Sequence, residues 1–306
     1  MIGSSFTFPL VSRRRLIGLA FGSMHGARRG SGSDIAGSRP YVPGDDPHRI
    51  DWAASGRLSA ARATDEFVVR EYFADEAPRA VVCVDRRPPM GICPPGLPFL
   101  HKDAAAAVAL ELIEDSVAES RGLIGLLEID AREKVVGWCP PASGRRTLAA
   151  VDHELPDRDT PTDGVTAMFE FLTLHRRSVP SASFVFVLSD FIEPTPLATW
   201  EWALDRGWDV VPVIVQDPTW EQGFPDVDRL VLPLAGADGR VRAVRLEKGE
   251  SRRWRQRHEA RLAELVDGLG SLGIEPVLVS QEDREHIFGA FLHWSTERQA
   301  AWGHAA

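Results

Sequence analysis

Short apolar runs alternate with longer helix-like stretches from residue 79 onward, and this alternation constrains the fold more than any other feature. The first run, Arg79–Asp85, is followed by the alanine-rich stretch Lys102–Arg121, which has the length and composition of a helix. Strands that alternate with helices build βα units around a largely parallel sheet with helices on its faces. The sequence therefore predicts an α/β domain of Rossmann-like type with a mostly parallel central sheet.

The same patterning predicts the remaining elements. Ser183–Leu188 is uniformly apolar, which is typical of a strand buried on both faces, so we expect it to be central in the sheet. Leu123–Ile129 and Lys134–Trp138 flank a polar turn and predict a hairpin. The other predicted elements are helices over 164–177, 196–206, 251–272 and 283–294, strands over 209–215 and 275–279, and a second hairpin over 229–234 and 240–246.

The first 75 residues differ from the rest of the chain. They are rich in glycine, include the low-complexity stretch GARRGSGSD, and show little helical periodicity. Because they offer little apolar material for a core of their own, we expect an irregular, β-containing adaptor segment packed on the main domain. The predicted division is residues 1–75 for this segment, 76–296 for the main domain and 297–306 for a flexible tail.

Charge, cysteine content and hydropathy exclude several classes of protein. The net charge is −9, with a local +3 on residues 1–72, so bulk binding to nucleic acid is disfavoured. The three cysteines form no CxxC pair and indicate neither a disulfide framework nor a zinc site. No apolar run approaches the roughly 18–20 residues that cross a bilayer, and Ser12–Ile17 matches a twin-arginine export signal only superficially. We expect a cytoplasmic protein without a membrane span.

Two further stretches have ordinary structural explanations. Gly268–Gly273 matches the dinucleotide fingerprint GxGxxG, but its glycines close a predicted helix and precede a strand, so they indicate a helix C-cap. Arg252–Arg261 is the densest basic run, and a helix would spread its arginines over a solvated face. A docking surface for an acidic partner remains open there.

The segment Tyr41–Trp52, YVPGDDPHRIDW, carries the most information in the chain. Pro43 and Gly44 suit the central positions of a type II turn, and Asp46 followed by Pro47 suits an N-cap and the first position of a helix. This local interpretation leaves a charge-dense set unexplained, which suggests a buried ion-pair network or a recognition surface. That set is Asp45, Arg49, Asp51 and Trp52.

These residues resemble the bacterial family called domain of unknown function 58. The most specific part of the resemblance is the set Arg39, Tyr41, Pro43, Gly44, Asp45, Asp46, Arg49, Ile50, Asp51 and Trp52, together with the strand ending at Asp85, LSDF at 188–191 and QDPTW at 216–220. The resemblance implies a von Willebrand factor A-like domain. It also implies a chaperone-like partnership with MoxR-type AAA+ ATPases, beside which members of the family are typically encoded.

The resemblance further implies a metal-ion-dependent adhesion site at the carboxyl edge of the sheet. In that fold an Asp-x-Ser-x-Ser loop, a distant Thr and a later Asp bind Mg²⁺ or Mn²⁺ through oxygen ligands. Asp85 matches the first Asp, Thr162 the Thr, and Asp190, which follows Ser189, the last Asp. The two serines of the loop fall on Arg87 and Pro89, so both hydroxyls are lost.

The replacement predicts a degenerate site with no cofactor. A guanidinium roughly 4 Å from a divalent cation repels it by several kcal/mol, so Mg²⁺ or Mn²⁺ at Asp85, Thr162 and Asp190 is not favoured. Two interpretations remain open. Arg87 or Arg86 simply neutralises Asp85 or Asp190, or one arginine replaces the metal as a fixed cation and receives an acidic residue from a partner.

We therefore expect a non-enzymatic protein–protein interaction module that works with a MoxR-type ATPase on an unknown client. The alternative is a carboxylate-based hydrolase or other enzyme that uses the Asp45, Asp46 and Asp51 cluster or Asp85, which requires carboxylates converging in a cleft. A third hypothesis is nucleic-acid binding through the basic N-terminal segment, which predicts an arginine stripe and salt-sensitive retention on DNA.

Overall fold

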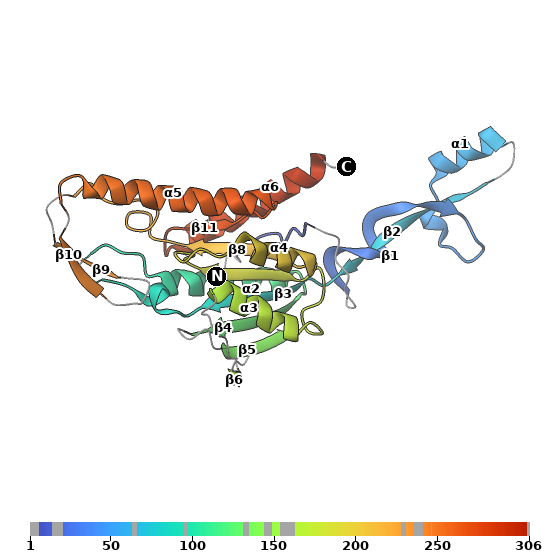
Figure 1. Ribbon diagram of the computed structural model, residues 1–306. Coiled ribbons are helices and arrows are strands. Elements are labelled where there is room, and N and C mark those ends of the chain that lie inside the picture. Colours follow the sequence, from blue (N-terminus) through green and yellow to red (C-terminus); the bar gives the residue numbers. More distant parts are fainter. Residues whose placement is uncertain are drawn as a thin grey trace, which may run out of the picture.

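A seven-stranded sheet forms the centre of the protein (Figure 1). The structure, a computed structural model, describes residues 6–13, 21–62, 66–94, 97–130, 135–143, 149–153, 163–227, 231–235, 241–245 and 247–304. The strands lie in the order β11-β8-β7-β3-β4-β5-β6. Their bounds are Arg79–Asp85 for β3, Leu123–Ile129 for β4, Val135–Ala142 for β5, Ala149–His153 for β6, Phe184–Ser189 for β7, Asp209–Val215 for β8 and Val277–Val279 for β11.

The sheet is mostly parallel, as the alternation of elements predicts. The neighbours from β11 to β4 all pair in parallel, whereas β5 and β6 add an antiparallel edge. The uniformly apolar β7 lies between β8 and β3, with all six residues buried, so its predicted interior position is confirmed. The predicted hairpin of β4 and β5 is also confirmed. The arrangement is consistent with the Rossmann-like α/β class.

Helices cover both faces of the sheet, which produces two apolar layers. Alternate residues of β3 enter opposite layers: Val82 and Val84 face one, and Val81 and Cys83 face the other. The first layer is closed by α2 (Lys102–Glu119) and α6 (Arg284–His304), and the second by α3 (Gly164–Leu174), α4 (Leu197–Asp205) and the end of α5 (Glu250–Ser271). A sheet buried on both faces explains why its strands read as continuous apolar runs.

Residues 21–76 form an arm that projects from the main domain instead of lying on it (Figure 1). The arm contains β1 (Phe21–Pro40), the short 3₁₀ helix η1 (Pro47–Arg49), α1 (Trp52–Arg62) and β2 (Val68–Glu76). The sequence correctly predicts β structure here, and the assignment of residues 1–75 as an adaptor segment stays a prediction. β1 pairs with β2 through several register shifts, as expected where a glycine-rich strand offers few side chains to fix the register.

The N-terminal residues 6–13 do pack on the main domain, against α6. Phe8 is buried and stacks on Phe291 with ring centroids 4.6 Å apart. Arg298 of α6 is 2% exposed and donates hydrogen bonds to the carbonyl oxygen of Val11 and to Asp209. α6 therefore continues to His304, beyond the predicted helix end at residue 294, and a buried arginine holds it on the main domain. The flexibility of the last residues stays a prediction.

The second predicted hairpin is also present. It consists of β9 (Val231–Ala235) and β10 (Val241–Arg245), which form a separate antiparallel sheet beside the start of α5 (Figure 1). None of the helices within the described residues is both long enough and apolar enough to cross a membrane.

Candidate functional site

Asp85 and Asp190 meet at the carboxyl edge of the sheet because β3 and β7 are parallel neighbours. Val84 is in register with Leu188, so the residues that follow each strand emerge side by side. This edge is where open α/β sheets place their binding sites. Both aspartates are buried, however, with 2% and 3% of their surface exposed. The two carboxylates at this edge are therefore shielded from solvent.

Arg87 satisfies Asp85 almost completely. Its side-chain nitrogens donate to both carboxylate oxygens over 2.8–3.1 Å, and its backbone N–H donates over 2.9 Å. The hydroxyl of Ser189 donates a further bond of 2.7 Å. Burial alone would lower the pKa of Arg87, but the bonds and charges of Asp85 and Glu193 raise it above its ordinary value. The guanidinium is therefore a permanent cation at this edge.

The outward side of the same guanidinium is also occupied. Arg87 donates from Nη1 to Glu193 over 2.6 Å, and the Glu193 side chain is 55% exposed. The guanidinium packs against Gly164, where an added Cβ would lie 2.8 Å from Arg87 Cζ. The arginine that one of the two interpretations expects to receive a partner's carboxylate thus already binds a carboxylate of its own chain.

A second cation, Lys102, neutralises Asp190. Its ammonium donates to Asp190 over 2.7 Å and to Glu221 over 2.5 Å, and the side chain is 1% exposed. Burial raises the pKa of Glu221; the lysine opposes this rise, and the charge of Asp190 adds to it. The buried Asp190 and the largely buried Glu221 therefore share one ammonium, which is why the desolvation of Glu221 is not fully offset.

Some of these partners are not found by reasoning from the sequence. The resemblance points to Arg86 or Arg87 as the neutralising cation, and the structure pairs Arg86 with Glu128 instead. Lys102 is missed, although it is one of three lysines in the chain and opens an alanine-rich helix. A cation in the first turn opposes the helix dipole, and this local cost is the signal that could have indicated a buried partner.

The structure describes the residue next to the predicted threonine, but not the threonine itself. Thr162 lies outside the described residues. Its neighbour Asp163 caps α3 by accepting from the backbone N–H groups of Val165 and Thr166, and its carboxylate also accepts from the hydroxyl of Thr195. Across the described part of the chain, no group of three or more His, Cys, Asp or Glu side chains is placed to hold a metal ion.

The Tyr41–Trp52 motif lies at the far end of the arm, away from the sheet edge. Gly44 has φ +106° and Asp45 N–H donates to Val42 O, which is the predicted turn. Asp46 caps η1 through His48 N–H, as predicted, although the helix is only three residues long. The backbone N–H of Arg49 donates to Asp46 O.

Two ion pairs brace this end of the arm. Arg39 donates two hydrogen bonds, of 2.6 and 2.7 Å, to Asp45, which lowers the pKa of that carboxyl to about 2. Asp51 accepts from the N–H of Ala54, which caps α1, and from Arg70 over 2.9 Å; these bonds lower its pKa as well. Both carboxylates are therefore structural and stay ionised at neutral pH.

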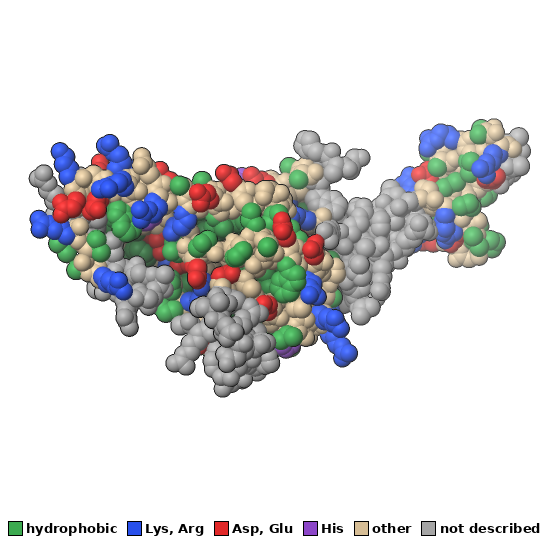
Figure 2. Space-filling view, in the orientation of Figure 1, with side chains coloured by type: hydrophobic (Ala, Val, Ile, Leu, Met, Phe, Trp, Pro, Cys, Tyr) green, Lys and Arg blue, Asp and Glu red, His purple; other side chains and the backbone are tan. Residues whose placement is uncertain are grey.

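Next to these two ion pairs, the arm exposes aromatic side chains to solvent. Trp52 is 66% exposed and packs edge-on against Phe67, which is 44% exposed and also contacts Tyr41 edge-on. Val42, at 57% exposure, lies in the adjoining turn. Figure 2 shows hydrophobic side chains at the end of the arm, interspersed with basic ones. Single exposed apolar residues are ordinary, but a large aromatic held in place on a projecting element is typical of an interaction surface.

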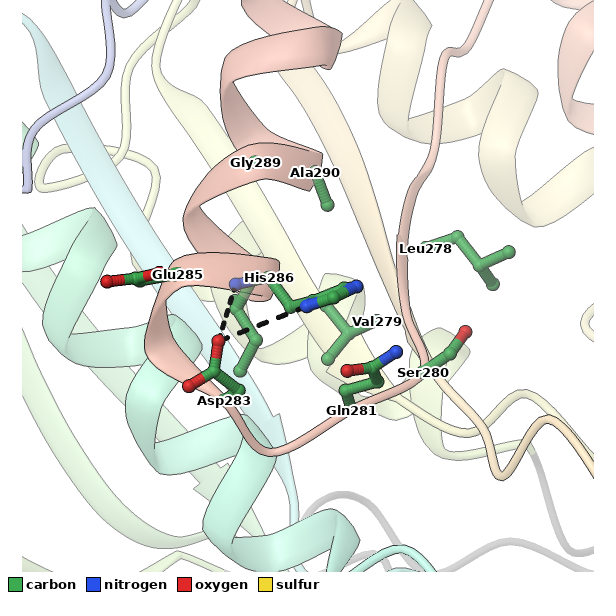
Figure 3. A pocket seen from close by; sticks show the side chains of 10 residues that line it. Leu278, Val279, Ser280, Gln281, Asp283, Glu285, His286, Gly289 and Ala290 are labelled. Atoms are coloured by element: carbon green, nitrogen blue, oxygen red, sulfur yellow. Dashed lines mark hydrogen bonds and ion pairs between the residues drawn. The ribbon is translucent and has the colours of Figure 1, made fainter.

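A hollow of about 490 Å³ lies elsewhere, between β11 and the start of α6 (Figure 3). One of its two carboxylates has an ordinary structural role: Asp283 accepts a hydrogen bond from His286 N–H over 3.1 Å and caps α6. Asp45, Asp46, Asp51 and Asp85 do not line it. The convergence of carboxylates that the enzyme alternative requires is thus not found at this hollow, and that alternative stays a prediction.

Comparison with known proteins gives a family without an assigned activity. The family described as "Protein of unknown function DUF58" matches residues 37–264. Uncharacterized proteins of Mycobacterium bovis and Mycobacterium tuberculosis are 24% identical to this chain over 301 residues, covering 96% of it and 89% of their own length. The matched region begins inside the arm and includes the edge of the sheet.

Proposed function

From the premise that the chain belongs to the family of unknown function DUF58, we propose that it is a protein–protein interaction module that docks a MoxR-type AAA+ ATPase. In this proposal the main domain is of von Willebrand factor A type and carries a degenerate adhesion site. The protein acts in the cytoplasm as a non-enzymatic adaptor between the ATPase and a client.

The observation that carries the proposal is the way in which the arm displays Trp52. The most specific family motif contributes little to a hydrophobic core: its charged residues form the ion pairs of Arg39 with Asp45 and of Arg70 with Asp51. The largest side chain of the motif is left 66% exposed. A rigid exposed tryptophan is the kind of residue that dominates binding energy at protein interfaces.

The sheet edge supports a role without a metal. An adhesion site binds its partner through a divalent cation with an open coordination position. Here Arg87 and Lys102 supply the positive charge, and carboxylates of the chain surround both of them. This favours partner recognition at the arm over recognition at the edge between Asp85 and Asp190.

The test is binding of the purified protein to a MoxR-type AAA+ ATPase from the same organism, measured by isothermal titration calorimetry with the ATPase in its ATP-bound and ADP-bound states. We expect Trp52→Ala to weaken binding at least tenfold, because truncation of a central aromatic typically costs about 2 kcal/mol or more. The matched control is Leu174→Ala, a side chain with similar exposure, 63%, at the end of α3.

The outcomes separate the parts of the proposal. If the wild-type protein binds the ATPase in neither nucleotide state, the proposed partner is wrong. If it binds and Trp52→Ala binds equally well, docking through the arm is wrong. Equal losses for Trp52→Ala and Leu174→Ala would also contradict a role specific to the arm.

A further inference from the structure

Positive charge is concentrated at the end of the molecule opposite the arm. Residues 241–261 contain eight Arg or Lys and three Glu, a balance of +5, which leaves −14 for the rest of the chain. This segment comprises β10 and the first half of α5. Figure 2 shows the basic side chains gathered at that end, with only a few acidic ones among them. We call this surface the basic pole.

One face of α5 is fastened to the loop that follows β8. Arg255 donates to Phe224 O over 2.8 Å, the ring nitrogen Nδ1 of His258 lies 2.7 Å from Gly223 O, and Arg261 donates to Glu221 O over 2.5 Å. Trp254 packs beside Phe224 on the same face, with ring centroids 5.8 Å apart. These contacts fix the rotation of the helix about its axis.

The fixed rotation places a second set of arginines outward. Arg252, Arg253 and Arg257 are exposed on α5, and Arg245 is exposed on the adjacent strand β10. The guanidinium of Arg257 stacks over the ring of Trp254, 5.6 Å from its centroid. The exposed arginines are therefore held on a rigid frame, in contrast to those of a mobile basic tail.

We propose that the basic pole is a docking surface for an acidic protein segment with some apolar side chains, such as an amphipathic acidic helix. Guanidinium groups bind carboxylates in a planar, bidentate manner. Trp254 and Val244 lie partly exposed between the outward arginines and the hydrophobic cluster around Phe224, and they offer apolar contact to the same ligand. The surface is separate from the arm and does not depend on the identity of the ATPase.

An acidic protein segment fits this surface better than nucleic acid does. Glu247, Glu250 and Glu259 lie among the arginines, and they would repel a duplex that carries one negative charge per roughly 1.7 Å of its axis. Carboxylates on a helix are about 5–6 Å apart at positions i and i+4 and can avoid these glutamates while still pairing with the arginines. The charge of −14 on the remaining chain also opposes the approach of a long polyanion.

The test is fluorescence anisotropy with a labelled peptide of about 20 residues in which glutamates and leucines alternate at helical spacing. The full chain should bind it, and binding should weaken at least tenfold between about 50 and 300 mM salt, because the contacts are exposed ion pairs. Arg252→Glu combined with Arg253→Glu should abolish binding. Both changes lie in the first turn of α5, where acidic side chains favour the helix, so the variant should fold.

The matched control is Arg176→Glu combined with Arg177→Glu, an adjacent exposed pair after α3 that changes the net charge equally. It should retain peptide binding. Equal loss in both double variants would overturn the proposal, because the effect would then come from net charge alone. Binding of a single-stranded or duplex oligonucleotide more tightly than the peptide at the same salt would also overturn it, as would failure of the wild-type chain to bind the peptide.

Discussion

The sheet edge and the arm use the same ingredients, arginine or lysine paired with aspartate or glutamate, with opposite results. At the edge, Lys102 and Asp190 are 1% and 3% exposed, and the ion pair between them is closed to solvent. On the arm, Arg39 and Asp45 form an equally short ion pair near the surface and leave Trp52 displayed. Burial, not the identity of the residues, decides whether a charged motif stabilises a fold or presents a surface.

The difference matters energetically because a buried charge loses its water. A surface ion pair contributes about 0–1 kcal/mol, whereas removing one partner of a buried pair leaves a desolvated charge behind. Mutations at the edge should therefore change the stability of the whole domain. Equivalent mutations on the arm should change binding and leave the stability of the main domain alone.

The largest effect is expected for Lys102→Met. The change leaves the buried Asp190 and the largely buried Glu221 without their shared cation, and we expect the free energy of unfolding to fall by about 3–5 kcal/mol in urea denaturation. Lys248→Met, at an exposed lysine, is the matched control and should be close to neutral. Arg39→Met should leave the main unfolding transition unchanged. A loss below about 1 kcal/mol for Lys102→Met would contradict the contrast between the two regions.

A smaller effect is expected for Gly164→Ala. The added Cβ would lie within 2.9 Å of Arg87 and Ile129, so the guanidinium must leave its position beside Asp85. Overpacking of this kind typically costs about 1–3 kcal/mol. Gly91→Ala is the control, since an added Cβ there has nothing within 4 Å. Equal melting temperatures for the two variants would show that Arg87 is not held by this contact.

The pH dependence should have opposite signs in the two regions. The pKa of Glu221 is raised in the folded state, so its contribution to stability is full below its unfolded pKa and is lost as pH rises through the folded pKa. The pKa of Asp45 is lowered to about 2, so its contribution is present above its unfolded pKa and is lost as pH falls through about 2. Each carboxyl can be titrated by NMR of the side-chain carbon.

Glu221→Gln sharpens this comparison. Relative to wild type, the variant should not show the decrease in unfolding free energy that accompanies ionisation of Glu221 on raising the pH from about 4.5 towards neutrality. Asp45→Asn should leave that part of the profile unchanged. If the comparison with Glu221→Gln showed that ionisation of Glu221 increases the free energy of unfolding over this pH range, the pKa of Glu221 would not be raised in the folded state.

The sequence predicts the central sheet well because its strands are specified locally. Arg79–Asp85, Leu123–Ile129 and Asp209–Val215 are continuous apolar runs between polar boundaries, and each strand has the predicted bounds. The carboxyl edge is harder, because its partners are distant in sequence: Lys102 lies 88 residues before Asp190 and 119 before Glu221. Only the short-range pair of Arg87 with Asp85 can be anticipated from the loop itself.

The arm shows the other limit of sequence reasoning. The turn at Gly44 and the cap at Asp46 depend on neighbouring residues and are correctly predicted. The position of the arm depends on how much apolar surface β1 and β2 bury against the main domain. Composition alone predicts that a segment with so little apolar material packs on the main domain. The end of α6 is mispredicted for a related reason, since Arg298 looks like a solvated residue until its contact with Asp209 is seen.

The smallest effect is expected on adding a metal, and it tests the edge most directly. Mg²⁺ and Mn²⁺ need several oxygen ligands, whereas the oxygens of Asp85 already accept from Arg87 and Ser189. A cation entering here would have to displace a guanidinium whose own charge repels it.

The melting temperature should therefore change by less than about 1 °C on adding either ion, since binding is what stabilises a folded state. Calcium serves as a control for general salt effects. A large stabilisation by Mg²⁺ or Mn²⁺ but not by calcium would mean that the edge opens, and that the contrast between a closed edge and a displayed arm does not hold in solution.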